Sequence, residues 1–183
     1  MMRWLWVSVV FLAGCGHVDI DHYRSSSPAF NLNEYFTGQT KAWGLVQNYR
    51  GEVVRRFNVG LCGYERDGQL ILDEDFVYDD GETQFRQWRI SPDGDGRWQG
   101  RADDIIGVAE GAEAGFALQW AYQMDLEVDD TVYRVSFDDW MYRLDEQHVF
   151  NRAAIKKWGF TVAEVTLFFE KRAPDCQPVT RRQ

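Results

Sequence analysis

One stretch of the chain decides its fold class, and it reads Phe116-Ala117-Leu118-Gln119-Trp120-Ala121-Tyr122-Gln123-Met124-Asp125-Leu126. Large apolar residues occupy every second position, and alanine or polar residues stand between them. Successive side chains on a β-strand point to opposite faces, so a period of two predicts a strand with one buried face and one solvated face. Strands of this kind are typical of antiparallel sheets.

The same alternation recurs on both sides of this strand. Residues 53–61 and 70–78 alternate, with Arg55 and Glu74 standing in the apolar phase, whereas residues 162–169 are apolar on both faces. Short turn sequences separate such segments. They are Asp67-Gly68, Asp79-Asp80-Gly81, Pro92 to Gly96, Gly111 to Gly115 and Asp129-Asp130. No segment has a sustained helical period, and residues 151–157 fit a short helix or a strand.

Eight to ten strands joined in sequence order by tight turns predict an antiparallel up-and-down β-barrel, because closure removes the unpaired edges of the sheet. We expect one all-β domain over residues 31–172, followed by a polar tail at residues 173–183. A barrel of this size encloses either packed side chains or one small ligand.

One segment changes phase. Residues 133–137 place their apolar side chains in one phase, and Trp140 and Tyr142 follow in the other. A switch of face needs one extra residue, so we expect a β-bulge near Asp138 and Asp139. In that register Trp140 and Tyr142 point into the barrel. Bulges occur both as architecture and beside functional sites, and the sequence leaves both interpretations open.

The amino terminus has the pattern of an export signal. Arg3 precedes an apolar run from residue 4 to residue 12, about half the length that crosses a bilayer. The run ends in Leu12-Ala13-Gly14-Cys15, which resembles the lipobox of bacterial lipoproteins. We therefore expect a signal peptide at residues 1–14, a lipid on Cys15, and a flexible tether over residues 15–30. Gly16, in place of Asp, favours the periplasmic face of the outer membrane in a Gram-negative cell.

Charge excludes one class of function. The chain has 29 acidic and 20 basic residues, a net charge of −9, and no run of Lys or Arg. Nucleic-acid binding depends on neutralising phosphates, so a nucleic-acid partner is not expected. His17 and His22 lie in the predicted tether, where a preorganised metal site is not expected, and no cofactor or metal is predicted.

The two remaining cysteines are Cys62 and Cys176. In an oxidising compartment they can form a disulfide that joins the tail to the barrel. The other interpretation is two separate thiols. The sequence gives no distance between them, so both remain open.

A series of short motifs resembles a known family. The motifs are Tyr35-Phe36-Thr37-Gly38, Arg56-Phe57, Asp73 to Gly81, Arg86-Gln87-Trp88, Gly100 to Ala109, Phe137 to Asp145 and Asn151-Arg152-Ala153. Together they resemble the Gram-negative lipoprotein family catalogued as domain of unknown function 3833. The resemblance implies an envelope lipoprotein with a lipocalin-like barrel. That family has no established activity, so the resemblance assigns no catalytic residue.

Aromatic content suggests where a ligand would bind. Eight Trp, eight Tyr and twelve Phe make up 15% of the chain, which suits a barrel lined by large rings. Pockets combine apolar walls with a few polar groups, which Arg55, Asn151 and Arg152 can supply. The predicted ligand-binding residues are Trp120, Tyr122, Asp138, Trp140, Tyr142, Asn151 and Arg152. The alternative is that the rings simply fill the core.

Three functions are compatible with this sequence. The first is a non-catalytic binder or carrier of a lipid or other apolar small molecule, and the second is an accessory lipoprotein that acts through a protein partner. The third is a lipid-modifying enzyme, for which Asp138, Asp139, Tyr142 and Arg152 would have to converge in one pocket. Common catalytic signatures, such as Gly-x-Ser-x-Gly and His-Glu-x-x-His, are absent from the sequence. We therefore expect no enzyme activity.

Overall fold

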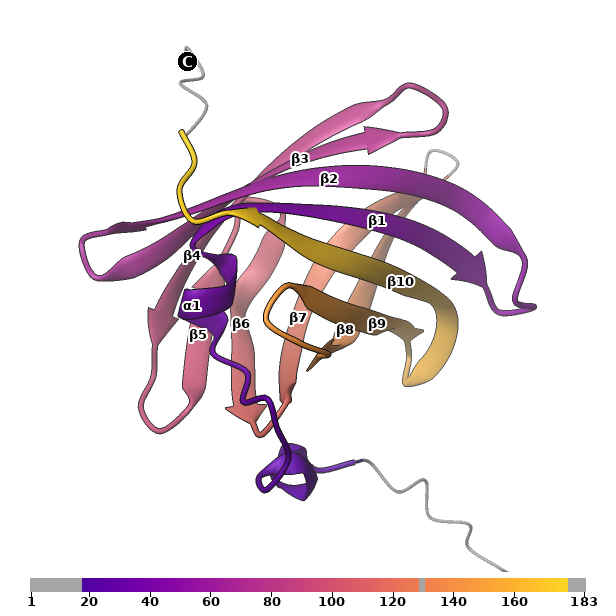
Figure 1. Cartoon of the computed structure of the whole chain (residues 1–183). Coiled ribbons are helices and arrows are strands. Elements are labelled where there is room, and N and C mark those ends of the chain that lie inside the picture. The colour runs from indigo at the N-terminus through magenta and orange to yellow at the C-terminus, as the bar shows by residue number, and fades with distance from the viewer. Residues whose placement is uncertain (1–17, 129–130, 178–183) are drawn as a thin grey trace, which may run out of the picture.

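Ten antiparallel strands close into one barrel (Figure 1) in a computed structural model that describes residues 18–128 and 131–177. The strands are β1 (Gly38–Asn48), β2 (Val53–Arg66), β3 (Gln69–Tyr78), β4 (Thr83–Pro92), β5 (Arg97–Arg101), β6 (Ile105–Ala114), β7 (Ala117–Val128), β8 (Thr131–Arg143), β9 (His148–Lys157) and β10 (Phe160–Ala173). The predicted signal peptide, Cys15, His17 and the Asp129-Asp130 turn lie outside the described residues.

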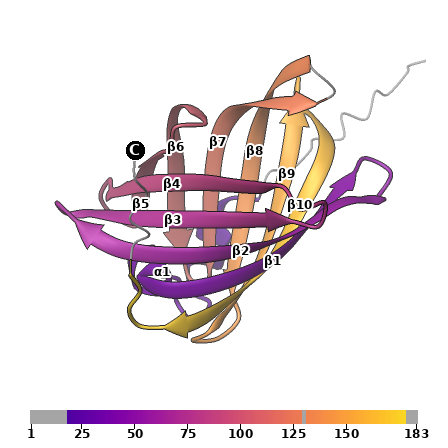
Figure 2. The same ribbon diagram turned by 90° about the horizontal axis from the view of Figure 1, so that it is seen from above.

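Each strand pairs with the next one in sequence, and β1 pairs with β10 to close the barrel. Figure 2 shows that β2 to β4 run across the direction of β7 to β9, as expected for strongly twisted strands. The predicted all-β up-and-down barrel of eight to ten strands is confirmed. Residues 151–157, which fitted helix or strand, belong to β9. No helix in the described ranges is long and apolar enough to span a membrane.

A short helix closes one end of the barrel. Helix α1 (Leu32–Phe36) is capped at its amino end by Asn31, whose side chain accepts a hydrogen bond from the backbone N–H of Glu34. Leu32 and Phe36 are buried against the strands, with 2% and 4% of their surface exposed. The Tyr35 hydroxyl donates to the carbonyl of Gln147, in the turn between β8 and β9, at 2.9 Å. These contacts hold α1 across the end of the barrel where β1 begins.

The segment before α1 also packs on the barrel. Residues Ile20–Tyr23 form a 3-10 turn, η1, and the Tyr23 ring lies edge-on against Phe116 at 5.2 Å between centroids. Phe30 is 4% exposed, and its amide donates to the carbonyl of Gly115. Gly115 is required here, because a Cβ on it would lie 1.7 Å from the carbonyl oxygen of Tyr23. The predicted flexible tether over residues 15–30 is therefore corrected: from Asp19 onward it is docked.

Strand β8 has no bulge, so that prediction is wrong. Its register with β7 is unbroken from Ala117 opposite Tyr142 to Val128 opposite Thr131. Phe137, Asp139 and Met141 line the interior, in one continuous phase. The apparent phase change arose because a carboxylate stands in the interior phase while two aromatic rings stand on the outer face.

Cys62 and Cys176 form a disulfide with their Cα atoms 5.7 Å apart. The sequence left open whether these cysteines form a disulfide or remain separate thiols, and the structure shows the disulfide. Cys62 lies on β2, and Cys176 follows the end of β10, so the bond spans the seam at which the first and last strands pair. Ala173, assigned to the polar tail from sequence, instead ends β10.

Candidate functional site

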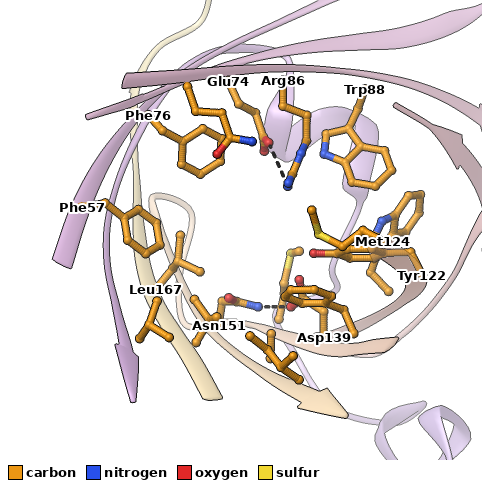
Figure 3. Close-up of a pocket in the computed structure, with 18 of the residues that line it drawn as sticks. Phe57, Glu74, Phe76, Arg86, Trp88, Tyr122, Met124, Asp139, Asn151 and Leu167 are labelled. Atoms are coloured by element: carbon orange, nitrogen blue, oxygen red, sulfur yellow. Dashed lines mark hydrogen bonds and ion pairs between the residues drawn. The ribbon is translucent and has the colours of Figure 1, made fainter. Parts of the chain in front are cut away.

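The barrel contains a cavity of about 540 Å³ (Figure 3). Leu32 and Phe36 of α1 form its floor, and at the other end it reaches Val54 and Val128, which are 60% and 50% exposed. The wall is otherwise built from inward-facing residues of the strands. This volume lies within the range of roughly 300–1,000 Å³ that is usual for small-molecule sites.

Aromatic rings form one continuous wall of the cavity. Tyr122 stacks on Phe137 with 4.7 Å between ring centroids and 7° between planes. Trp88 stands edge-on to Tyr122 at 5.5 Å and to Trp120 at 5.7 Å. Edge-to-face and offset pairs at these distances stabilise one another beyond the burial of their surface. The rings therefore form a rigid apolar face for a ligand to lie against.

Trp120 is held in place by two glycines. The register sets Gly111 of β6 directly opposite Trp120 of β7. A Cβ on Gly111 would lie 2.3 Å from the indole, and a Cβ on Gly100 of β5 would lie 2.4 Å from it. The ring occupies the space that side chains at these two positions would need, so both glycines are required for its position.

Glu74 of β3 and Arg86 of β4 interrupt the apolar wall. The guanidinium of Arg86 holds Asp104 at 2.7 Å and lies 3.9 Å from the carboxylate of Glu74. Burial raises the pKa of Glu74 to about 7, although the charge of Arg86 opposes the shift. Oε2 of Glu74 has no hydrogen-bond partner among the described residues.

A second polar pair lies on the opposite wall (Figure 3). Asn151 of β9 is fully buried, and its amide donates to the carboxylate of Asp139 and to the carbonyl of Trp140. Burial raises the pKa of Asp139 to about 7, against the effect of the hydrogen bond from Asn151. Oδ1 of Asn151 accepts no hydrogen bond from any residue that the structure describes.

Arg55 lies where the cavity reaches solvent. It pairs with Asp80 at 3.0 Å and with Glu82, and its guanidinium covers the ring of Tyr78 at 3.6 Å. The Tyr78 hydroxyl donates to Gln84 at 2.9 Å. Arg55 was suggested from sequence as a polar contact, and the structure places it in the cavity lining with two acidic partners.

Of the seven predicted ligand-binding residues, the structure brings three to the cavity and leaves four outside. Trp120, Tyr122 and Asn151 line it. The remaining four lie on the outer face of the barrel, and they are Asp138, Trp140, Tyr142 and Arg152.

The prediction that Trp140 and Tyr142 point inward is wrong, and its physical reason is the docked amino-terminal segment. The ring of Tyr23 covers both from outside, at 6.0 Å and 5.9 Å. Arg152 reaches across the outer face to Glu164 at 2.6 Å.

The four residues that an enzyme would need in one pocket do not lie together. Only Asp139 of that group lines the cavity, whereas Asp138 accepts hydrogen bonds on the outer face from Gln119, Trp140 and Lys156. Within the described ranges no three His, Cys, Asp or Glu side chains lie close enough together to hold a metal ion.

Glu74, Arg86 and Asp139 were not predicted from the sequence as ligand contacts. A usable signal was present, because each of them is a polar residue in the inward phase of its strand. Glu74 stands between Leu72 and Phe76, and Arg86 stands two residues before Trp88. A charged residue at an inward position of a barrel strand is costly unless it is paired, so it marks a candidate site.

The fold and the cavity define a class: this is a lipocalin-like β-barrel with an internal ligand-sized space. The chain belongs to the family described as protein of unknown function DUF3833, whose pattern matches residues 9–171. Among solved structures it is similar to an S-type phycobiliprotein lyase from Guillardia theta, with a TM-score of 0.53 and 9% identity over 77% of this chain and 91% of that one. At this identity the likeness concerns the fold. No curated protein sequence matches the chain.

Proposed function

We propose that this protein is a lipid-anchored carrier of the bacterial envelope that binds one lipid or other apolar molecule inside its barrel. The observation that carries the proposal is the cavity of about 540 Å³, lined mainly by aromatic and aliphatic side chains. An apolar ligand gains roughly 25 cal/mol for each Å² of its surface removed from water there. A barrel filled by its own side chains would leave no such space, so the cavity favours a carrier over a purely structural role.

Three observations support export and anchoring. Residues 12–15 read Leu-Ala-Gly-Cys after a short apolar run, and the family match begins at residue 9 and therefore includes Cys15. The Cys62–Cys176 disulfide suits an oxidising compartment such as the periplasm. Gly16 favours the outer membrane as the destination of the lipid anchor.

A single substitution that fills the cavity tests the carrier. Ala153 is 2% exposed and lines the cavity, so Ala153→Trp places an indole in the ligand's space. Residues 16–183, which contain the whole barrel, are purified from the periplasm and weighed under native conditions, and lipids are extracted. We expect one ligand per wild-type barrel and at least a tenfold loss of binding in Ala153→Trp.

The neighbouring Ala154→Trp is the matched control, because Ala154 is absent from the cavity lining and its new ring would lie on the outer face. This variant is expected to bind like wild type. If the wild-type protein returns only its own mass, even after incubation with fatty acids and phospholipids, the carrier proposal fails. An accessory role through a protein partner then gains support from the exposed rings of Tyr49, Trp158 and Phe160, which are 71%, 86% and 76% exposed.

The anchor has its own test. Full-length Cys15→Ser is expected to lose incorporation of labelled palmitate completely and to move from the membrane fraction to the soluble fraction, because the sulfur that carries the diacylglycerol is gone. Cys62→Ser and Cys176→Ser are matched controls that keep the label. Continued labelling of Cys15→Ser would contradict anchoring at this residue.

A further inference from the structure

The cavity contains hydrogen-bond acceptors that lack donors. Oε2 of Glu74 and Oδ1 of Asn151 are buried, and neither receives a hydrogen bond from the described residues. Asn151 has no exposed surface, so its amide oxygen is withheld from bulk water. Buried polar atoms are nearly always paired, because an unpaired one has lost its hydration without replacement. An occupant of the cavity that brings hydrogen-bond donors is therefore favoured over one that brings only acceptors.

The charges around these acceptors are unbalanced. Arg86 is the cation nearest to Glu74, but its guanidinium already holds Asp104 at 2.7 Å and reaches Glu74 only at 3.9 Å. Asp139, on the opposite wall, has a neutral amide as its partner. Together with Asp104, these two carboxyls outnumber Arg86, which is the one cation that forms an ion pair with any of the three in the described residues. Burial favours the neutral forms of Glu74 and Asp139, so a cationic head would be attracted to their carboxylates and help to keep them ionised, whereas an anionic head would oppose their ionisation.

The polar groups converge in the middle of the cavity. Arg86, Tyr122 and Asp139 line the same cavity as Glu74. Figure 3 shows the Glu74 and Arg86 pair facing the Asp139 and Asn151 pair across the open space. Apolar side chains lie above and below this level, so one molecule can place a polar head between the two walls and a hydrocarbon chain against the rings.

We infer that the ligand is an amphiphile with a hydrogen-bond-donating, cationic head, such as a primary amine, and that this head binds between Glu74, Asp139 and Asn151. The inference rests on the proposed carrier function and names its ligand class. An ammonium group has three donors and no acceptor. Its N–H groups can therefore serve carboxylate and amide oxygens on either wall of the cavity, and hydrogen bonds to charged groups of this kind are the strong ones.

The test uses probes that share a twelve-carbon chain and differ in the head. Dodecylamine, dodecyltrimethylammonium, dodecanol and dodecanoate are titrated below their micelle concentrations into delipidated residues 16–183, with calorimetry and tryptophan fluorescence as readouts. We expect dodecylamine to bind about tenfold or more tighter than dodecanoate. Dodecyltrimethylammonium has the same charge but no N–H donor, so it should also bind more weakly than the amine.

Three variants locate the head. Asp139→Asn and Glu74→Gln keep shape and remove charge, and each is expected to weaken dodecylamine about tenfold while leaving dodecanol within about threefold of wild type. Asp138→Asn, one residue away on the outer face, is the control and should change neither. Dodecanol binding also reports that each variant remains folded.

The outcomes separate the two proposals. If every probe binds with the same affinity, or dodecanoate binds most tightly, the carrier stands and the amine-head inference is overturned. If no probe binds to the wild-type protein, the carrier proposal fails and the inference fails with it.

Discussion

Truncating Trp120 to alanine is expected to lower the free energy of unfolding by about 3–5 kcal/mol. The indole is 5% exposed, stands edge-on to Trp88, and fills the space above Gly100 and Gly111. Glycine backbone on two strands cannot move inward to replace the ring, so its removal leaves an unfilled volume beside the existing cavity. Urea unfolding followed by circular dichroism measures the loss.

Two further variants test the cause of this effect. Trp158→Ala removes the same group from a position that is 86% exposed, and its effect should stay within about 0.5 kcal/mol. Gly111→Ala overpacks the same contact instead of emptying it, because the new Cβ would lie 2.3 Å from the Trp120 ring. We expect it to destabilise the barrel by about 1–3 kcal/mol. A loss below about 1 kcal/mol in Trp120→Ala would mean that the ring is not packed on the glycines.

Removing the disulfide is expected to be the second large effect. The Cys62→Ser, Cys176→Ser double variant should lose about 2–4 kcal/mol, because the bond closes a loop with a sequence separation of 114 and so restricts the unfolded chain. The disulfide also links the segment after β10 to β2, and β1 lies between these two strands in the sheet. Without it, the seam between the first and last strands is held by hydrogen bonds and packing alone. For a domain of this size, the melting temperature should fall by roughly 5–15 °C.

Reductant provides the matched comparison for the disulfide. Dithiothreitol should lower the melting temperature of the wild-type protein to that of the double variant, and it should leave the double variant unchanged. A wild-type melting temperature that does not respond to full reduction would contradict a stabilising role for this bond.

Much of the architecture was predictable because it depends on local pattern. The alternation in residues 116–126, and the same period in other segments, identifies β-strands from local sequence alone. Because short turns connect consecutive strands, strands that are adjacent in sequence are also adjacent in the sheet. Strand number, antiparallel pairing and closure follow from that. Trp120 and Tyr122 were placed in the barrel for the same reason, since they stand in the dominant apolar phase of their strand.

The candidate site was only partly predictable, because the face of a residue was inferred from its polarity alone. Trp140 and Tyr142 are apolar and yet lie outside, since Tyr23 from the docked amino-terminal segment covers them. Asp139 is charged and yet lies inside, since Asn151 on the next strand donates to it. Tyr23 is far from both rings in sequence, whereas Asn151 is only 12 residues from Asp139 and reaches it through the pairing of β8 with β9.

The sequence by itself therefore determined the class of fold, the inward phase of most strands and the pairing order, because these depend on a period of two and on turn chemistry between adjacent segments. Tertiary structure alone decided that Cys62 meets Cys176, that the predicted tether packs on the barrel, and that space remains inside the barrel. Each of these depends on distances between residues far apart in sequence, and no local pattern encodes such distances.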